Sequence, residues 1–327
     1  MDKRYIKIKN KSSEVTIDSV GAQIVSYKIN GVEIMFQGAI NPQENQWAGT
    51  AKNLFPNPGP VADKSSNPVI IEGEENGRSG KYTKYTHNSG VYFMKQHGFV
   101  QDKPFEVQGK GNDWCMLSTR ADDKTYLQFP FDFKYDMLIT ISESGLAYQA
   151  TAKNLDNKPM VAGLGWHPAF KLHKGCKHYA VVFKNLKTKE GKCVPEEGKD
   201  YPAEEVVYSD SAVKFDGIEE ADFEIVYIDE KGNRTPYLTM HTTEPYMLLW
   251  SRAKENDLQD DFICLEPWNT QTKQISKLTT QDKTRQFSEE GTVILEPSEE
   301  RSLIVPIKID EEYVKMLQKE NNRESEN

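Results

Sequence analysis

Three residues at the ends of expected strands could carry acid–base chemistry: Glu266, His97 and His167. Glu266 stands in the segment ICLEPW (263–268), where an apolar run meets a proline that cannot continue strand pairing. Burial of a carboxylate at this point would raise its pKa and make it a candidate general base. A solvated carboxylate at a strand end is the simpler interpretation of the same residues.

The two histidines occupy similar places, where a strand gives way to irregular backbone. His97 lies in KQHGFV (95–100), and His167 lies in GWHPAF (165–170). Strand ends of a β-sandwich can meet on one face, and two imidazoles beside a carboxylate would supply both a proton acceptor and a proton donor near neutral pH. Either histidine alone is also typical of a structural position.

The residues that surround these groups indicate the class of ligand. Aromatic side chains such as Trp166, Phe170 and Trp268 suit a sugar, whose C–H faces stack on rings while its hydroxyls form hydrogen bonds. Two histidines and a glutamate are also a possible metal-ligand set. The sequence contains no local spacing such as His-x-x-x-His, so we expect no metal.

Period-2 alternation of apolar and polar residues dominates the chain and predicts an antiparallel β protein with little helix. The alternation over 135–141 is the clearest, and Asn30-Gly31 between two apolar runs is the strongest hairpin signal. A shorter strand-like run covers 126–129. Segment 39–90 is rich in Asn, Pro, Gly and Ser, which is typical of a long functional loop or of disorder.

Helical periodicity is best at the C-terminus, where Tyr313, Met316 and Leu317 are spaced for one helix face. No internal repeat or low-complexity linker divides the chain. We therefore expect a single large antiparallel β-sandwich domain over 1–310. A short C-terminal helix and flexible tail should follow over 311–327.

Composition restricts the class of protein further. The chain has 327 residues, a net charge of −9 and 37% hydrophobic residues, which fit a sizeable core and argue against nucleic acid or an anionic membrane surface as a partner. No apolar run is long enough for a membrane span, and the first residues lack the apolar segment of a signal peptide. The four cysteines are widely spaced, which favours reduced thiols and a cytoplasmic location.

Three segments, taken in this order, resemble the aldose 1-epimerase (galactose mutarotase-like) family, and especially its bacterial mutarotase-related proteins. These segments are HGF at 97–99, GWHPAF at 165–170 and EPW at 266–268. The segment LFPNPG at 54–59 and the pair Gly21-Ala22 also fit. The resemblance extends over residues 1 to about 310.

The resemblance implies an all-β fold, a large antiparallel β-supersandwich with an open sugar-binding cleft. It implies that Glu266 is the general base that takes the proton of the C1 hydroxyl, that His167 is the acid that protonates the ring oxygen, and that His97 holds the substrate. The ring opens to the aldehyde, C1 rotates, and the ring closes on the other face. No metal or organic cofactor is implied.

The chain departs from the family at one position that contacts the sugar. Relatives carry an arginine shortly after the Phe-Pro…Gly segment, whereas this chain reads GPVADK at 59–64 and offers Lys64 as the nearest cation. Lysine lacks the planar fork of arginine, so its hydrogen-bond geometry differs. We expect Lys64, Phe55, Trp166 and Trp268 to contact the substrate together with His97.

The family's substrate-binding aspartate has no clear match, although Asp210 and Asp216 lie in the corresponding region. The expected activity is that of an aldose 1-epimerase-like isomerase acting on a small-molecule sugar, an aldohexose or a derivative. Two alternatives remain open. One is a non-catalytic carbohydrate-binding protein on the same scaffold, which the missing arginine favours.

The other alternative is a sugar-phosphate mutarotase, which would need a cluster of cations. Such a cluster could come from Lys52, Lys64, Arg78 and Lys81. Their scatter is equally typical of solvated surface residues.

Overall fold

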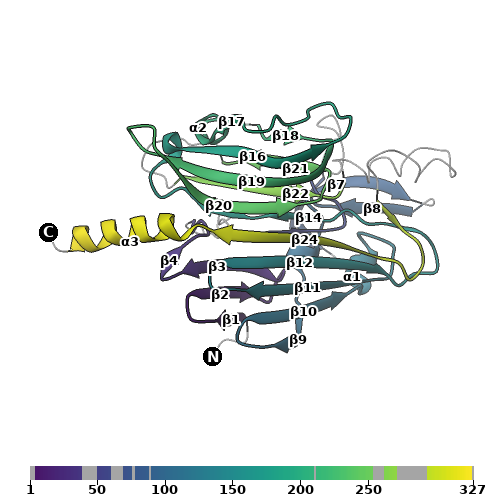
Figure 1. Cartoon of the computed structure of the whole chain (residues 1–327). Coiled ribbons are helices and arrows are strands. Elements are labelled where there is room, and N and C mark those ends of the chain that lie inside the picture. Colours follow the sequence, from purple (N-terminus) through teal and green to yellow (C-terminus); the bar gives the residue numbers. More distant parts are fainter. Residues whose placement is uncertain are drawn as a thin grey trace.

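The computed structural model describes residues 4–38, 50–59, 69–75, 78–87, 90–209, 211–252, 261–270 and 293–325. Antiparallel strands dominate this part of the chain, and its two largest sheets have nine and six strands (Figure 1). Buried side chains from both sheets belong to one continuous hydrophobic core. The all-β supersandwich expected from the sequence is therefore confirmed.

The nine-stranded sheet has the order β17-β16-β19-β20-β24-β12-β11-β10-β9. The alternation that predicted a strand over 135–141 is observed as a regular buried/half-buried pattern along β11, because one face of the sheet covers the core. Its strands are β9 (Glu106–Lys110), β10 (Trp114–Arg120), β11 (Phe133–Ile141), β12 (Gly145–Asn154), β16 (Tyr179–Thr188), β17 (Asp200–Pro202), β19 (Ile218–Ile228), β20 (Arg234–Thr242) and β24 (Glu300–Ile309).

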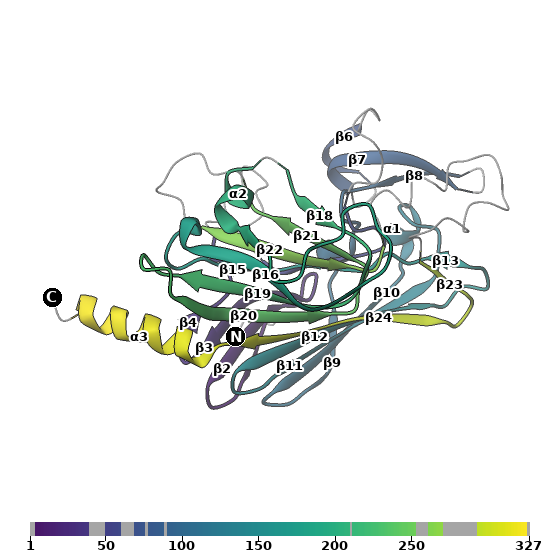
Figure 2. The same cartoon turned by 45° about the horizontal axis from the view of Figure 1, so that its top comes forward.

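The six-stranded sheet carries the segments that the sequence analysis singled out. Its order is β18-β21-β22-β14-β5, and β15 also pairs with β22. Figure 2 shows β21 and β22 above β16, β19 and β20. The strands are β5 (Lys52–Leu54), β14 (Gly165–His167), β15 (Ala169–Lys171), β18 (Val213–Phe215), β21 (Tyr246–Trp250) and β22 (Phe262–Trp268).

Smaller sheets complete the described β-structure. The predicted turn at Asn30-Gly31 is confirmed, since both residues have a positive φ (48° and 84°) and the flanking strands β3 and β4 pair directly. The small sheets contain β1 (Tyr5–Lys9), β2 (Ser13–Asp18), β3 (Gln23–Ile29) and β4 (Val32–Glu33); β6 (Val69–Glu75), β7 (Arg78–His87) and β8 (Gly90–Met94); and β13 (Met160–Val161) with β23 (Ile294–Leu295).

Two expectations about secondary structure were wrong. Segment 39–90 contains regular strands, because β6 and β7 pair with each other and β7 pairs with β8. The strand expected over 126–129 is absent, and a helical turn, α1 (Asp123–Tyr126), ends there instead. The Asp122 side chain caps this turn and Thr125 completes the capping box, so local hydrogen bonds outweigh the apolar run.

The remaining helical segments are short, apart from the one at the C-terminus. They are η1 (Val100–Asp102), η2 (Cys176–His178), α2 (Ala203–Val207) and α3 (Glu311–Ser325). Helix α3 extends away from the sheets in Figure 1, and its first turns bury Tyr313, Val314 and Leu317. None of the helices in the described ranges is long and apolar enough to cross a membrane.

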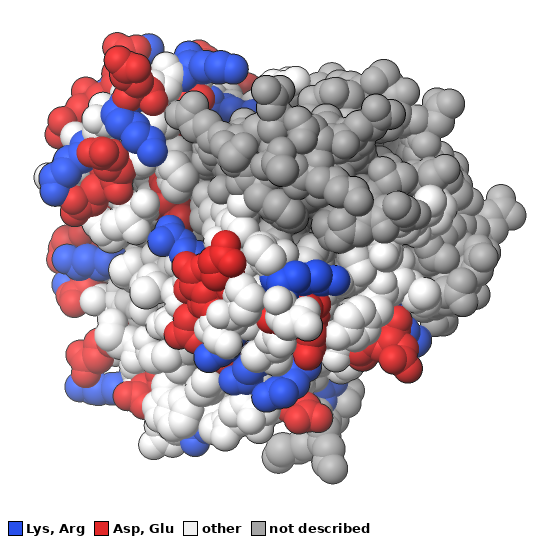
Figure 3. Space-filling view, turned by 90° about the vertical axis from the view of Figure 1, so that its right-hand side faces the viewer, with Lys and Arg blue, Asp and Glu red and all other residues white. Residues whose placement is uncertain are grey.

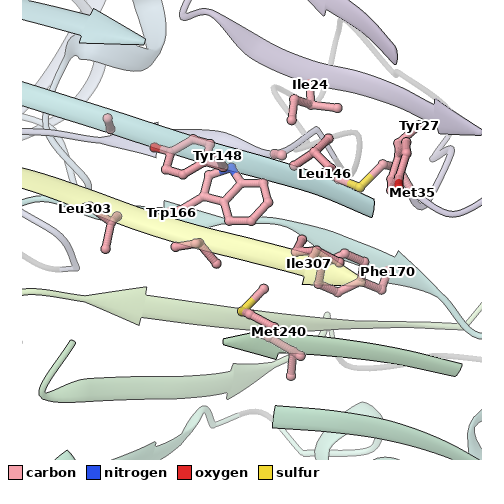
Figure 4. Close-up of a cluster of buried hydrophobic side chains, with 14 of the residues drawn as sticks. Ile24, Tyr27, Met35, Leu146, Tyr148, Trp166, Phe170, Met240, Leu303 and Ile307 are labelled. Carbon is pink, nitrogen blue, oxygen red and sulfur yellow. The ribbon is translucent and has the colours of Figure 1, made fainter. Parts of the chain in front are cut away.

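A stacked aromatic pair connects the two large sheets. Trp166 of β14 lies over Tyr148 of β12, with ring centroids 4.3 Å apart and planes 14° apart (Figure 4). The Tyr148 hydroxyl donates a hydrogen bond to Asn53 Oδ1 of β5 (2.5 Å), so a buried polar contact accompanies the stack. These contacts hold β5 and β14, the strands that carry part of the candidate site, against the nine-stranded sheet.

Candidate functional site

The register of the six-stranded sheet lines up three chemically distinct side chains. His167 of β14 lies directly opposite Lys52 of β5. The strand pairs on both sides of His167 share one register with β22, and this register places Glu266 opposite His167 on its other side. Directly opposed side chains lie on the same face of a sheet, so the order across this face is Glu266, His167, Lys52.

The same row continues beyond Glu266 in the opposite direction. Leu248 of β21 is opposite Glu266, and Lys214 of β18 is opposite Leu248. Trp166 and Leu265 alternate with this row and point into the main core. The two-residue period of a strand thus separates packing residues from residues that face the site.

His167 and Glu266 form a buried pair. His167 Nε2 lies 3.4 Å from Glu266 Oε1, and the two residues are only 8% and 3% exposed. Glu266 Oε2 is buried and accepts no hydrogen bond of standard geometry from any group that the structure describes, although the Trp268 indole N–H is close enough to lower the pKa of Glu266. A buried carboxylate oxygen without a well-aligned donor is rare and costly, so a hydroxyl group that donated to it would be stabilised.

Burial sets the protonation of this pair. It raises the pKa of Glu266 well above its usual range, and the nearby indole of Trp268 and the charge of Lys214 offset this only in part. Burial also lowers the pKa of His167 well below its usual range, with smaller contributions from His97 and Lys52. Two groups whose pKa values shift in opposite directions are typical of an acid–base pair.

Trp268 has a buried hydrogen-bond donor near the buried acceptor Glu266 Oε2. Its indole is 2% exposed, and its Nε1 donates no hydrogen bond of standard geometry to any described acceptor. It packs with Leu54 and Leu248 on the site face of the sheet. Gly165 makes this packing feasible, because a Cβ there would lie 2.7 Å from the Trp268 ring. A hydroxyl group, which both donates and accepts, could satisfy Glu266 Oε2 and the Trp268 N–H together.

His97 enters the site from the connection between β8 and η1. Its ring lies 5.6 Å from the His167 ring and 6.2 Å from the Trp268 ring, both edge-on. His97 has a positive φ of 68°, an unusual conformation for a residue with a side chain. Such strain persists only where surrounding contacts hold it, and it is concentrated at functional positions.

A pair of hydrogen bonds with Gly59 holds His97 in this conformation. The His97 N–H donates to Gly59 O (2.9 Å), and the Gly59 N–H donates to His97 Nδ1 (3.0 Å). Because Nδ1 accepts, the proton of the neutral ring is on Nε2. Gln96 Nε2 lies 3.1 Å from this nitrogen, so a hydrogen bond between the two side chains requires the Gln96 amide to turn its oxygen toward the ring. Burial, aided by Lys52, lowers the pKa of His97 to about 3, so its ring is a neutral hydrogen-bonding group.

Gly98 brings this connection against the segment that contains Phe55. Gly98 has a φ of 75°, and a Cβ there would lie 2.0 Å from Phe55 O. The N–H groups of Phe99 and Val100 also donate to Phe55 O. The main chain of Phe55 therefore positions His97, while the Phe55 ring packs inside an aromatic cluster with Phe133 and others.

The structure brings together four of the residues predicted from the sequence: Glu266, His167, His97 and Trp268. It places the side chains of Phe55 and Trp166 in the interior instead, with exposures of 0% and 1%, because their neighbours in sequence point to the site. We therefore no longer expect these two rings to touch a ligand; they support the strands beneath it.

The cation and one of the two aspartates expected near the sugar cannot be compared with this group, because they are outside the part of the chain that the structure describes. Lys64 and Asp210 lie outside the described residues. Asp216 Oδ1 accepts a hydrogen bond from the Cys193 backbone at 2.7 Å, so this carboxylate stabilises a loop.

Two further residues lie on the site face. Lys52 was named from the sequence only as one member of a scattered set of cations, and Trp250, whose ring is edge-on to His167 at 5.5 Å, was not named as a substrate contact. The sequence signal for Lys52 was its position two residues before the apolar pair Leu54-Phe55. No local signal distinguished Trp250 from a core residue.

Over the ranges that the structure covers, no three His, Cys, Asp or Glu side chains are arranged to hold a metal ion. Figure 3 shows a face on which the described positive and negative side chains are interspersed. This distribution is typical of a solvated surface.

Comparisons with known proteins identify the family and the fold of this chain. The family model described as aldose 1-epimerase matches residues 4–282. The fold is similar to a galactose mutarotase related enzyme from Lactobacillus acidophilus, with a TM-score of 0.69, 18% identity, and coverage of 94% of this chain and 97% of that one. No curated protein matches the sequence significantly.

Two further solved structures share the fold. A galactose mutarotase-like protein from Lactobacillus casei has a TM-score of 0.68 and 20% identity, and the match covers 94% of this chain and all (100%) of that one. A GalM/aldose epimerase homologue from C. elegans has a TM-score of 0.59 and 14% identity, with coverage of 94% and 98%. At these identities the structural neighbours support the fold alone.

Proposed function

We propose, since this chain belongs to the aldose 1-epimerase family, that it interconverts the α and β anomers of an aldohexose or a close derivative. The observation that carries the proposal is the buried pair in which Glu266 Oε1 lies 3.4 Å from His167 Nε2. The second carboxylate oxygen, without a donor, is free to accept the proton of a sugar hydroxyl.

Ring opening needs one base and one acid on the same sugar. Glu266 takes the proton of the C1 hydroxyl while His167 gives a proton to the ring oxygen, so the C1–O5 bond breaks and C1 becomes an aldehyde. Rotation about C1–C2 exposes the other face of the carbonyl. Closure reverses the roles: His167 takes the C5 hydroxyl proton and Glu266 protonates the carbonyl oxygen. His97, neutral and fixed by Gly59, holds a hydroxyl through its Nε2–H.

Glu266 and His167 share one proton during this cycle, and the pKa shifts determine which of the two residues holds it more stably. The reactive arrangement is a Glu266 carboxylate with a His167 imidazolium. After ring opening the proton is on Glu266 and His167 is neutral, which is the arrangement that burial favours. The total charge of the buried site is the same before and after ring opening. Burial therefore favours the protonation arrangement that follows ring opening over the carboxylate–imidazolium pair from which opening starts.

Polarimetry of freshly dissolved α-glucose and α-galactose tests the proposal. The wild-type protein should accelerate the approach to anomeric equilibrium, and Glu266→Gln should reduce this acceleration at least about 100-fold, because the base is lost. Circular dichroism should show an unchanged fold. The exposed Glu143→Gln is the matched control, and it should leave the rate unaltered. Equal rates for Glu266→Gln and wild type would refute the assignment of the base.

A non-catalytic sugar-binding protein is the second candidate, because Pro60 stands in the region where relatives carry the sugar-contacting arginine. Calorimetry with the same sugars separates the two candidates. Binding without any acceleration of mutarotation would favour the second candidate. Acceleration would exclude it.

A further inference from the structure

Lys52 ends the row of site-facing side chains, beside His167 on the last strand of the six-stranded sheet. Opposed residues of antiparallel strands have Cβ atoms about 5 Å apart, so the Lys52 side chain starts next to the imidazole. Lys52 is half-buried, and within the described part of the chain it forms no ion pair and donates no hydrogen bond. A half-buried cation without a counter-charge is costly, and this favours an anion supplied from outside.

The charged residues near Lys52 do not neutralise the positive charge of its ammonium group. Asp102 attracts it through space, but the Asp102 carboxylate already forms an ion pair with Lys95 Nζ at 3.1 Å. Lys95 in turn repels Lys52. Burial is the largest influence, and it lowers the pKa of Lys52. A ligand anion would oppose this effect and stabilise the ammonium form of Lys52.

The order of groups along the row gives the orientation of the sugar. In the proposed reaction Glu266 acts at the C1 hydroxyl and His167 acts at the ring oxygen. The ring oxygen of a hexopyranose is bonded to C1 and C5, and C5 carries C6. One strand spacing beyond His167, about 4.8 Å in the same direction, the next side chain is Lys52. The row therefore directs C6 toward Lys52.

We propose that Lys52 binds an anionic group on C6 of the sugar, the phosphate of a hexose 6-phosphate or the carboxylate of a hexuronate. This inference rests on the proposed 1-epimerase function. Both groups present the negative charge that an ammonium recognises as a point charge, without the bidentate geometry that arginine would impose. Lys52 is thus a specificity-determining residue: it selects the substrate through charge, and Glu266 and His167 perform the reaction.

Anomer exchange measured by NMR on three sugars tests this selection. The sugars are glucose, glucose 6-phosphate and glucuronate, and the readout is the ratio of kcat/KM for each anionic sugar to kcat/KM for glucose. We expect a ratio of at least about 10 for one of the anionic sugars in the wild type, the size expected for one charge-assisted hydrogen bond. The sugar that shows the preference identifies phosphate or carboxylate as the group.

The variants isolate the charge of Lys52. Lys52→Met should reduce the ratio about tenfold, Lys52→Gln should do the same if the methionine variant does not fold, and Lys52→Arg should keep most of it. The ratio is informative because any effect of Lys52 on His167 acts on all three sugars and cancels. Lys214→Met, at the other end of the row, should leave the ratio unchanged.

Each contrary result has a distinct meaning. Equal ratios in the wild type and Lys52→Met overturn the role of Lys52 while the 1-epimerase function stands. Loss of the ratio in Lys214→Met but not in Lys52→Met overturns the orientation. If the protein accelerates the anomer exchange of none of the three sugars, the proposed function fails. Calorimetry then tests anion recognition by itself: if Lys52→Met binds glucose 6-phosphate and glucuronate as tightly as the wild type does, the proposed role of Lys52 is overturned as well.

Discussion

The buried carboxylate of Glu266 lowers the stability of the folded state and is also a candidate functional group. Its pKa is raised because water is excluded, and one of its oxygens has no described hydrogen-bond donor of standard geometry. A residue selected only for stability would not be retained in this state, since an apolar side chain of similar size would pack without penalty. The unfavourable burial of Glu266 therefore supports the proposal that it is the base.

This cost predicts a pH-dependent gain of stability in Glu266→Gln. The native pKa of Glu266 lies above the unfolded value of about 4.3, so the native state binds more protons and loses stability as pH rises through the interval between the two values. Glutamine does not titrate. Glu266→Gln should therefore match the wild type near pH 4 and exceed its Tm by roughly 2 °C at pH 8.

Thermal unfolding followed by circular dichroism at both pH values measures this difference. The exposed Glu143→Gln should show the same small change at each pH. A Tm difference for Glu266→Gln that is constant between pH 4 and pH 8 would contradict the raised native pKa.

At the scale of elements, the connection between β8 and η1 places His97 through backbone geometry. His97 and Gly98 both have a positive φ, and Gly98 lies against the carbonyl of Phe55 with no room for a side chain. The hydrogen bonds from Gly59 then orient the imidazole. This part of the site depends on main-chain contacts, which explains why a glycine follows the histidine.

Gly98→Ala should destabilise the protein by more than the strain of placing an alanine at a positive φ. The new Cβ would lie 2.0 Å from Phe55 O, so either His97 or the Phe55 segment must move. We expect a loss of at least about 2 kcal/mol in unfolding free energy and a higher KM for the sugar, because His97 is displaced.

Gly198→Ala is the matched control for this prediction. Gly198 has nearly the same φ (74°), but a Cβ there meets nothing within 4 Å. Urea unfolding gives the loss of stability in each variant. The difference between the two losses is the effect of the steric clash with Phe55 O, because both variants place alanine at a similar positive φ. Equal losses of stability in the two variants would show that the close approach to Phe55 does not matter.

At the scale of the whole molecule, three sheets meet at one buried asparagine. Asn53 of β5 accepts a hydrogen bond from Tyr148 of the nine-stranded sheet (2.5 Å). Its amide donates to Gly21 O in the turn between β2 and β3 (2.6 Å). Asn53 adjoins Lys52, so the contact that joins the sheets also fixes the strand on which the proposed anion-binding residue lies.

Asn53→Ala should therefore destabilise the entire domain. It would leave the Tyr148 hydroxyl and the Gly21 carbonyl buried without their partner, a cost of roughly 2–4 kcal/mol in unfolding free energy. Urea unfolding measures this loss, and the exposed Asn157→Ala should change it by less than about 0.5 kcal/mol. A similar small effect for both variants would show that the junction contributes little.

Local sequence determined the features that depend on neighbours along the chain. Period-2 alternation sufficed for β11, Asn30-Gly31 for the hairpin, and the ordered segments around His97, His167 and Glu266 for the family. Each depends on backbone preferences or on residues that are adjacent in sequence. At α1 two local signals conflicted. The apolar run over 126–129 predicted a strand, but the capping box stabilised a helical turn instead.

Only the tertiary structure decided which side chains share the site. Lys52 and Glu266 are separated by more than 200 positions, and the register of β5, β14 and β22 brings them into one row. The packing of one sheet face on the core also determined that Trp166 points inward while His167 points to the site. Strand pairing and the choice of buried face are settled by contacts distant in sequence, and no local pattern encodes them.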